Sequence, residues 1–426
     1  MFEERPLGSL IDRQTGGGTP SRQVPSFWKG KIPWASVKDF KDDQSSISET
    51  EEYISEEGLR ASASNLIPEN TVLICSRMAV GRAAISKVSI AINQDLKALF
   101  PKAGVDQRYL LRVFQWVKRQ AENLAVGSTV KGIRIADLLG LQIPVAPEVD
   151  QPAIANILDT LDTQIRQTEA IIVKLQQVKQ GMLHDLLTRG IDANGQLRPP
   201  RNQAPGLYKE SPLGWIPREW EVRNLSQLTS LITSGSRGWA LYYSDTGSLF
   251  LRSQNVRMGC LDLSERQCVK PPTDGEGLRT RVEALDLLVT ITGNGVGNLA
   301  YLPDGWSEIA FVSQHVALVR FVDPWLAKLA NHYLVLGGPG RQQIVDAQYG
   351  QSKPGLNLES LRNIRIPAPS NTESEEIIAR VALLNKRVED EVSLVGQLHS
   401  VKAGLMDDLL TGRVRVTSLL DTAKAS

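Results

Sequence analysis

The sequence is poor in the residues that build disulfide frameworks and metal sites. Its 426 residues include three cysteines and four histidines. Cys75, Cys260 and Cys268 show no C-x-x-C spacing, and the histidines form no H-x-x-x-H pair, so neither a disulfide framework nor a common zinc site is indicated. No apolar run approaches the length of about 18 residues that a membrane span needs, and the acidic start is unlike a basic signal peptide. We expect a cytoplasmic protein without a membrane partner.

An excess of one charge is also missing. The 48 lysines and arginines balance 47 acidic residues to a net charge of +1, so total charge does not indicate nucleic acid. The distribution is uneven, because residues 77–134 hold eleven basic and three acidic side chains. This clustering fits a basic binding face and a merely solvated surface equally well. The length predicts two to four domains.

An internal repeat with an offset of 223 residues organises the chain. Within residues 175–188, eight of fourteen positions recur in residues 398–411, among them Lys179 as Lys402 and Gly181 as Gly404. The register continues upstream without a gap over 57 residues. Such a match predicts that one structural unit occurs twice.

The repeated segment has the 4-and-3 spacing of a coiled-coil seam, with a polar fifth position at Thr168 and Glu391. The seam, which is the candidate subunit interface, comprises Ile154, Leu158, Leu161, Ile165, Ile172 and Leu175 in the first copy and Ile377, Val381, Leu384, Val388, Val395 and Leu398 in the second. Two helices of about 40 residues follow, each roughly 60 Å long and far longer than an average globular helix, which is typical of spacers. The paired Gly181 and Gly404 predict a close helix approach or a local break.

Each helix is preceded by a Gly-rich region with short apolar runs, which predicts a globule of mixed strands and helices. The fold class is therefore α+β, with two globules alternating with two long helices that pair as an antiparallel, pseudo-two-fold coiled coil. The expected order is a first globule at 1–150, a helix at 151–193, a Pro-rich linker at 194–211, a second globule at 212–370, a helix at 371–414 and a tail at 415–426.

No catalytic constellation is recognisable. The chain has no G-x-x-x-x-G-K-[ST] loop and no Asn/Asp-Pro-Pro-Tyr-like element, which argues against nucleotide hydrolysis and self-contained base methylation. The glycine-rich segment 293–298 lacks a sixth-position glycine, which makes a strand-to-strand turn the favoured interpretation over a nucleotide site. His315 and His332 lack a neighbouring nucleophile pattern, which favours structural or surface roles. We expect no metal, no cofactor and no catalytic residue in this chain.

Polar and aromatic residues instead indicate contact with nucleic acid. A flexible loop around Thr19 precedes basic residues that are interleaved with Trp28 and Trp34, and a similar stretch around Trp239 occurs in the second globule. The favoured interpretation of the three tryptophans is that they belong to the cores. Arginine and lysine neutralise phosphates, whereas Arg, Gln and Asn read guanine and adenine in the major groove. The candidate DNA contacts are Arg22, Lys29, Lys31, Arg77 and Arg82 in the first globule and Arg237, Arg252, Gln254, Asn255 and Arg257 in the second.

These features together resemble the specificity (S) subunit of type I restriction-modification systems over nearly the whole chain. The resemblance is carried by the helix ends at 179–192 and 402–412, by Gly17 to Ser21 with Ile32-Pro33-Trp34, and by residues 213–220. The first globule lacks the Trp-Ile-Pro element and the second lacks a clear Thr-Pro-Ser, so the recognition loop of the second is placed less securely.

The resemblance implies a non-catalytic subunit in which each globule is a target-recognition domain for one half of a split, asymmetric site in double-stranded DNA. It further implies two methylation (M) subunits that carry S-adenosylmethionine and dock one per repeat, and restriction (R) subunits that use ATP. Two other functions stay open at this stage, a coiled-coil scaffold whose globules bind protein and an unrecognised single-chain nuclease or methylase.

Overall fold

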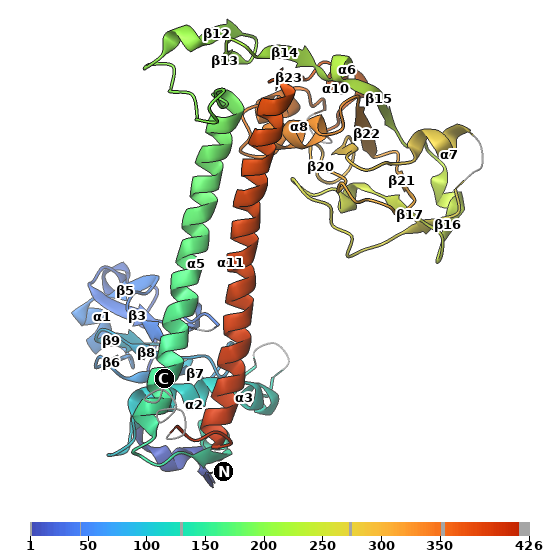
Figure 1. Ribbon diagram of the computed structural model, residues 1–426. Helices are drawn as coiled ribbons and strands as arrows, with labels where there is room; N and C mark the ends of the chain where they lie inside the picture. The colour runs from blue at the N-terminus through green and yellow to red at the C-terminus, as the bar shows by residue number, and fades with distance from the viewer. Residues whose placement is uncertain (1, 43, 128–130, 272–274, 351–353, 417–426) are drawn as a thin grey trace. The chain divides into compact units, whose positions relative to one another are not determined.

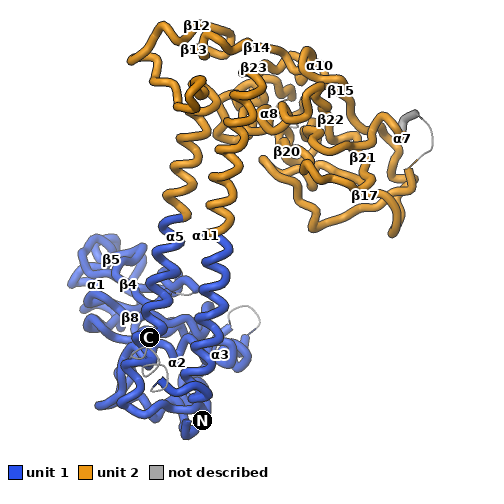
Figure 2. The backbone as a smooth tube through the Cα atoms, in the orientation of Figure 1, with its two compact units in different colours: residues 1–171, 391–426 blue, residues 172–390 orange. Residues whose placement is uncertain are grey.

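The protein forms two compact units in which the same arrangement of strands and helices occurs twice. The computed structural model describes residues 2–42, 44–127, 131–271, 275–350 and 354–416. Unit 1 contains residues 1–171 and 391–426, and unit 2 contains residues 172–390 (Figure 2). Each of the two long helices is therefore shared between the units.

Unit 1 is built from short strands and helices that precede the first long helix (Figure 1). Its strands are β1 Glu3–Pro6, β2 Ile11–Gly16, β3 Ile32–Ala35, β4 Ser46–Ile47, β5 Glu52–Ile54, β6 Asn65–Ile67, β7 Val72–Cys75, β8 Ala83–Ser86, β9 Ile90–Ile92, β10 Leu96–Pro101 and β11 Gln142–Val145. Its helices are α1 Glu56–Arg60, α2 Gln107–Trp116, α3 Lys118–Leu124 and α4 Ile135–Leu139, followed by α5 Gln151–Thr188, and its 3-10 turns are Leu7–Leu10, Pro25–Trp28 and Val37–Asp39.

Unit 2 follows the same plan after a linking segment. Its strands are β12 Tyr208–Ser211, β13 Gly214–Pro217, β14 Glu221–Asn224, β15 Thr229–Ser234, β16 Tyr243–Ser244, β17 Ser248–Leu251, β18 Cys268–Val269, β19 Leu287–Thr290, β20 Leu299–Tyr301, β21 Ala310–Val312, β22 Val316–Phe321 and β23 Arg365–Ala368. Its helices are α6 Leu225–Leu228, α7 Gly275–Thr280, α8 Leu326–Leu334, α9 Arg341–Asp346 and α10 Leu358–Arg362, followed by α11 Asn371–Thr411, and its 3-10 turns are Pro205–Leu207, Trp239–Tyr242 and Ser253–Asn255.

The strand orders establish the internal repeat. The sheet β2-β10-β7-β8-β4 of unit 1 corresponds to β15-β22-β19-β20 of unit 2, and the pairs β2·β10 and β15·β22 are both antiparallel. The parallel pair β3·β9 likewise corresponds to β17·β21. The strands β7 and β19 are buried along their whole length, which explains why both read as short continuous apolar runs in the sequence.

The two long helices pair within each unit in an antiparallel sense. In unit 1 the first half of α5 shares a buried cluster with the last turns of α11, including Leu158, Leu161 and Leu409. In unit 2 the end of α5 shares another cluster with the start of α11, including Leu186 and Ile377. The expected α+β architecture with paired long helices is thus confirmed.

The helices end where left-handed glycines follow them. Gly190 and Gly412 have φ values of +62° and +72°, a backbone conformation that favours glycine just past a helix C-terminus. The helical residues stop at Thr188 and Thr411, short of the expected limits at 193 and 414. Neither the close approach nor the local break expected at Gly181 and Gly404 is found in the described part of the chain: both helices run through these positions without a break, and apart from a helix's own neighbouring backbone no atom would lie within 4 Å of a Cβ there.

Candidate nucleic-acid interface

In unit 1 three loops meet at one end of the main sheet, and we call this the first loop edge (residues 17–20, 76–81 and 93–95). The amide of Ser76 donates to the carbonyl oxygen of Asp95 over 2.8 Å, which ties the loop after β7 to the loop after β9. Gly17 lies so close to the chain that a Cβ atom there would be 1.9 Å from the carbonyl oxygen of Ile92. Only glycine therefore lets the loop after β2 reach this edge.

Unit 2 repeats this backbone frame at the second loop edge (residues 234–237, 291–297 and 313–315). The amide of Ile291 donates to the carbonyl oxygen of His315 over 2.9 Å, as Ser76 does to Asp95. A Cβ atom at Gly235 would lie 2.2 Å from the carbonyl oxygen of Val312, as at Gly17 and Ile92. The two edges are therefore built on one backbone plan.

Polar side chains occupy the first loop edge. Thr19 Oγ1 donates to Gln94 Oε1 over 2.6 Å, and Arg77 Nη1 lies 3.3 Å from Asp95 Oδ1. Asn93 Nδ2 also donates to Asp95 Oδ2 over 3.2 Å. The Arg77 side chain is 53% exposed and that of Asp95 only 12%, so the carboxylate holds a guanidinium that faces solvent.

At the second loop edge a histidine takes the place of this carboxylate. His315 Nδ1 lies 2.7 Å from Thr292 Oγ1, and Gln314 Nε2 lies 3.1 Å from His315 Nε2. The exposed Arg279 side chain reaches the loop after β15, where it donates to the carbonyl oxygen of Ser234 and to Ser236 Oγ, each over 2.8 Å. Hydrogen-bonding groups thus gather at both edges, but they differ in chemistry.

Of the candidate contacts in the first globule, Arg77 lies on the loop edge and the others lie elsewhere. Arg22 stacks on the ring of Trp28 with 3.6 Å between its Cζ and the ring centroid, and its Nη2 donates to Glu52 over 2.8 Å. The hydrogen bond that Arg22 donates to Glu52 raises the pKa of Arg22, and the arginine stays charged. Lys29 and Lys31 are exposed nearby.

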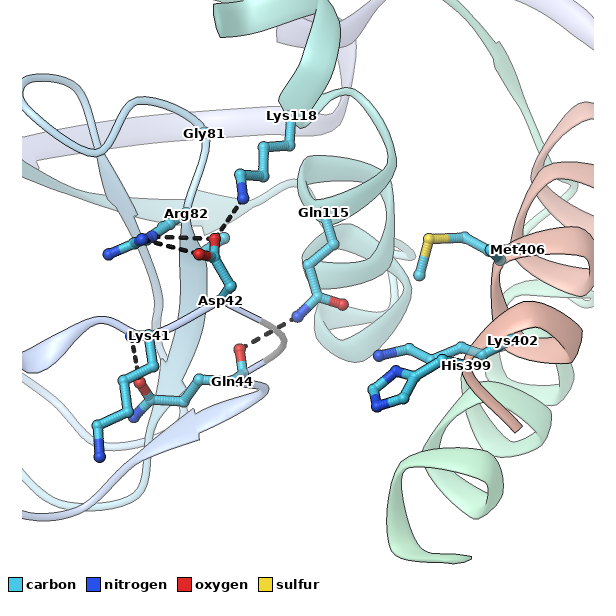
Figure 3. A pocket seen from close by; sticks show the side chains of 12 residues that line it. Lys41, Asp42, Gln44, Gly81, Arg82, Gln115, Lys118, His399, Lys402 and Met406 are labelled. Atoms are coloured by element: carbon cyan, nitrogen blue, oxygen red, sulfur yellow. Dashed lines mark hydrogen bonds and ion pairs between the residues drawn. The ribbon is translucent and has the colours of Figure 1, made fainter. Parts of the chain in front are cut away.

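Arg82 belongs to a cavity rather than to the loop edge. Its Nη2 pairs with Asp42 Oδ2 over 2.8 Å, and its Nη1 donates to the carbonyl oxygen of Phe40 over 2.8 Å. The cavity, of about 150 Å³, is also lined by Lys118 and by His399 and Lys402 of α11 (Figure 3). Because Lys118 also pairs with Asp42, the pKa of that carboxyl is lowered, first by Lys118 and then by Arg82.

The candidate contacts in the second globule divide into exposed and buried residues. Arg237 and Arg257 are exposed, and Arg257 Nε lies 3.2 Å from Asp262. Arg252 is half-buried, and Gln254 Nε2 donates to Glu265 over 2.8 Å. Asn255, in contrast, is 1% exposed.

The buried Asn255 amide holds its own loop. Asn255 Nδ2 donates to the carbonyl oxygens of Asp262 and Glu265, each over 2.9 Å, while Oδ1 accepts from the amide of Arg252. These bonds occupy the groups that would read adenine, so we remove Asn255 from the candidate contacts.

Sequence reasoning missed most of the polar residues at the loop edges. Gln94 follows Asn93 and Gln314 follows Ser313 in the sequence, but nothing in this local pattern indicated that both glutamines lie at the end of a sheet. The contact between His315 and Thr292 gave no signal, because it joins residues 23 positions apart with the strands β20 and β21 between them. The tryptophan prediction is confirmed at Trp34 and Trp239, which are each 3% exposed, while Trp28 is half-buried.

The helix seam is buried in the N-terminal part of each helix and half-buried in the part that follows. The buried members are Ile154, Leu158, Leu161, Ile165, Ile377 and Val381, and the half-buried members are Ile172, Leu175, Leu384, Val388, Val395 and Leu398. The ends pack against the cores of their own units.

Buried charges join α2, α5 and α11 in unit 1, and we call this cluster the helix ion network (Arg112, Asp159, Asp162 and Lys402). Asp162 Oδ2 lies 2.6 Å from Arg112 Nη1, and Asp162 Oδ1 lies 2.6 Å from Lys402 Nζ. The side chains of Arg112, Asp162 and Lys402 are 1%, 7% and 7% exposed. Burial raises the pKa of Asp162, but Arg112 and Lys402 outweigh it and lower the pKa overall.

The described ranges lack two further features. They contain no group of three or more His, Cys, Asp and Glu residues placed to hold a metal ion. Among the helices of this part of the chain, none combines the length and the apolar composition that a membrane crossing requires.

Comparison with known proteins places these features in a family context. Residues 1–177 match the family model described as the type I restriction modification DNA specificity domain. The chain is 26% identical to the MjaIX specificity subunit of Methanocaldococcus jannaschii over 96% of this chain and 93% of that protein. It is 33% identical to the EcoR124I/EcoR124II specificity subunit of Escherichia coli over 43% of this chain and 48% of that protein.

Solved structures show the same fold. The S subunit of a type I restriction-modification system from M. genitalium aligns with a TM-score of 0.55 and 16% identity over 96% of both chains. A chain from a structural study of complex assembly in the type I R-M system aligns with a TM-score of 0.62 and 14% identity over 97% of this chain and 98% of that chain.

Proposed function

Because this chain belongs to the family of type I restriction-modification specificity subunits, we propose that its two loop edges read the two halves of a split, asymmetric DNA site. Membership of this family makes the chain a DNA-specificity subunit and not a catalytic subunit. Specificity subunits of this family bind DNA and assemble with other subunits. We propose that each of the two units reads one of the two half-sites.

The observation that supports the proposal is that the same frame of backbone hydrogen bonds occurs at both loop edges. The hydrogen bonds from Ser76 to Asp95 and from Ile291 to His315 place the same loops at the same sheet end in both units. A protein that reads two different half-sequences needs two such surfaces with different side chains on them. The paired edges meet this requirement.

Basic residues around the edges supply the contacts to phosphate, which position a protein on DNA without reading its sequence. The proposed DNA contacts, whether to phosphates or to base edges, are Arg22, Lys29, Lys31, Arg77, Arg82, Arg237, Arg252, Gln254 and Arg257. Among them, Lys29, Lys31 and Arg237 are exposed. Arg82 is the least accessible of the proposed arginine contacts in unit 1, because Asp42 and Phe40 engage its guanidinium and its side chain is 30% exposed, against 55% for Arg22 and 53% for Arg77.

The exposed faces of the long helices supply the docking sites for two methylation subunits. Ile171 and Val178 of α5 are 45% and 53% exposed, and their repeat equivalents Leu394 and Val401 of α11 are 41% and 48% exposed. The members of each pair are seven residues apart and lie on one helix face. We call these the repeated apolar stripes.

A glycine lies beside each of the repeated apolar stripes. Gly181 and its equivalent Gly404 are exposed beside the stripes, with no described atom near the position of a Cβ. A small residue lets a partner helix approach the backbone closely. We propose that one methylation subunit docks on each stripe, that these subunits bind S-adenosylmethionine, and that restriction subunits using ATP join the complex.

The experiment replaces the two equivalent valines in the full chain. Val178→Glu should remove one methylation subunit from the purified complex, Val401→Glu should remove the other, and the double variant should retain neither, as measured by native mass spectrometry. Val173→Glu is the matched control, because Val173 is also 54% exposed on α5 but its repeat equivalent is Gly396. Retention of both subunits by the double variant, or loss of both in a single variant, would contradict one subunit per repeat.

A further inference from the structure

Two units that read different sequences must share what positions the DNA and differ in what selects the bases. The two loop edges share a frame of backbone hydrogen bonds, a close-packed glycine, and a glutamine at equivalent positions, Gln94 and Gln314. Features that are the same at both edges cannot distinguish one half-sequence from the other. The discriminating groups are therefore those that differ on the shared frame.

The clearest difference lies one residue after the shared glutamine. Asp95 and His315 occupy equivalent positions. The carbonyl oxygen of Asp95 accepts from the amide of Ser76 after β7, and the carbonyl oxygen of His315 accepts from the amide of Ile291 after β19. Their side chains then hold different neighbours, Arg77 at the first edge and Thr292 at the second.

At the first edge the carboxylate orients a guanidinium. Arg77 Nη1 pairs with Asp95 Oδ1 at 3.3 Å, and Asp95 is kept in place by Asn93. No other ion pair of Arg77 is found within the described residues, and its side chain is half-exposed. A guanidinium held in this way presents paired donors, the arrangement that matches O6 and N7 of guanine.

At the second edge the histidine orients a hydroxyl group. In the amide orientation assigned to Gln314 its Nε2 donates to His315 Nε2, and with this assignment Nδ1 carries the ring proton and donates to Thr292 Oγ1. This tautomer follows from the hydrogen-bond network. Thr292 keeps its hydroxyl proton for an outside acceptor, so the second edge offers a neutral group where the first offers a cation.

We infer that the pairs Arg77–Asp95 and Thr292–His315 determine which base each unit accepts at equivalent positions of the two half-sites. The first pair selects guanine, and the second reads its base through a hydroxyl group without the bidentate cation. The inference rests on the proposed function, because it assumes that each loop edge faces one half-site.

The test maps methylated motifs in DNA exposed to the full chain together with its methylation subunits. Arg77→Lys keeps the positive charge but loses the paired donors. It should reduce the preference for guanine at one position of one half-site about ten- to hundredfold and leave the other half-site unchanged. Asp95→Asn should weaken the same preference to a smaller extent. Thr292→Val, which removes the hydroxyl at nearly constant shape, should change the other half-site only.

The control and the overturning outcomes separate this inference from the proposed function. Arg60→Lys alters an exposed arginine on α1, outside the loop edge, and should leave the motif unchanged. If Arg77→Lys keeps the wild-type motif, or lowers methylation equally at all sequences, Arg77 is a phosphate contact and the inference is wrong. If the wild-type complex methylates a motif that is not split, the proposed function itself fails.

Discussion

The helix ion network offers the sharpest test of how the helices and unit 1 are held together. Asp162→Asn removes one charge at nearly constant volume from the buried contact among α2, α5 and α11. Arg112 keeps its contact with Asp159, where Nη2 and Oδ1 are 2.5 Å apart, whereas Lys402 loses its charged partner. The perturbation is therefore concentrated on a lysine whose side chain is 7% exposed.

The expected magnitude follows from the burial of that lysine. Removing one partner of a buried ion pair costs about 3–5 kcal/mol, because the remaining charge stays desolvated. Since Arg112 remains paired, we expect the lower end, about 3 kcal/mol. At 1.4 kcal/mol per factor of ten, unit 1 should open roughly a hundredfold more often.

Hydrogen exchange measured by mass spectrometry on the full chain resolves this effect by region. Amides of α2, residues 151–171 and residues 391–411 should exchange about a hundredfold faster in the variant. Peptides from α8 in unit 2 serve as the internal reference. Asp185→Asn is the matched control on the same helix, because Asp185 is 38% exposed and, among the described residues, forms its ion pair with Arg189 four residues away, a contact worth about 0.5 kcal/mol or less.

The pH dependence gives a second readout with a defined sign. The pKa of Asp162 is lowered in the folded protein, so its contribution is complete above the unfolded pKa of about 3.9 and is lost as the pH falls through the folded pKa. The difference between wild type and Asp162→Asn should therefore shrink below about pH 4. Unchanged protection in unit 1 at pH 7 would refute the reasoning that this network stabilises the helix pair.

Three further predictions concern DNA binding and assembly. The DNA affinity of the complex should fall steeply as the salt concentration rises. If Lys29 contacts a phosphate, Lys29→Gln should reduce the slope of log affinity against log salt by about one and weaken binding to all sequences equally. An unchanged slope would remove Lys29 from the proposed contacts. The double variant Leu175→Asp with Leu398→Asp places two charges on the helix seam, so the complex should fail to assemble in sedimentation, whereas an intact complex would show that the seam is not the organising element. A fragment ending near Pro200 should pair with a second copy through the vacated seam and, with methylation subunits, modify a palindromic split site; a folded fragment that stays monomeric at micromolar concentration would contradict this.

The long helices could be predicted because their signal is local and periodic. The seam spacing and the repeat offset defined them to within a few residues at each end, with the C-terminal limits five and three residues beyond Thr188 and Thr411. Gly181 and Gly404 show where this reasoning stops. Their recurrence was visible, but whether a neighbour approached them depended on packing, and the described structure leaves both open.

The loop edges could be predicted only in part, because their geometry depends on pairing between distant strands. Gln94 comes beside Thr19, 75 residues away, through the pairing of β2 with β10, in which Gly16 lies opposite Lys97, and through the close approach at Gly17. Asn255 illustrates the opposite error, since its residue type fits base reading but its amide is used by its own loop. The type of a side chain alone does not reveal whether its polar groups already form hydrogen bonds within the protein.

The measurement that tests the central claim most directly is the mapping of methylated bases in DNA from cells that contain this chain and its methylation subunits. The proposed function predicts one motif made of two different half-sequences separated by a fixed gap of unspecified bases. It further predicts that replacing residues 1–150 by the corresponding globule of a related specificity subunit changes one half-sequence and leaves the other half and the gap intact. A continuous motif, or an exchange that alters both halves together, would contradict the assignment of one half-site to each unit.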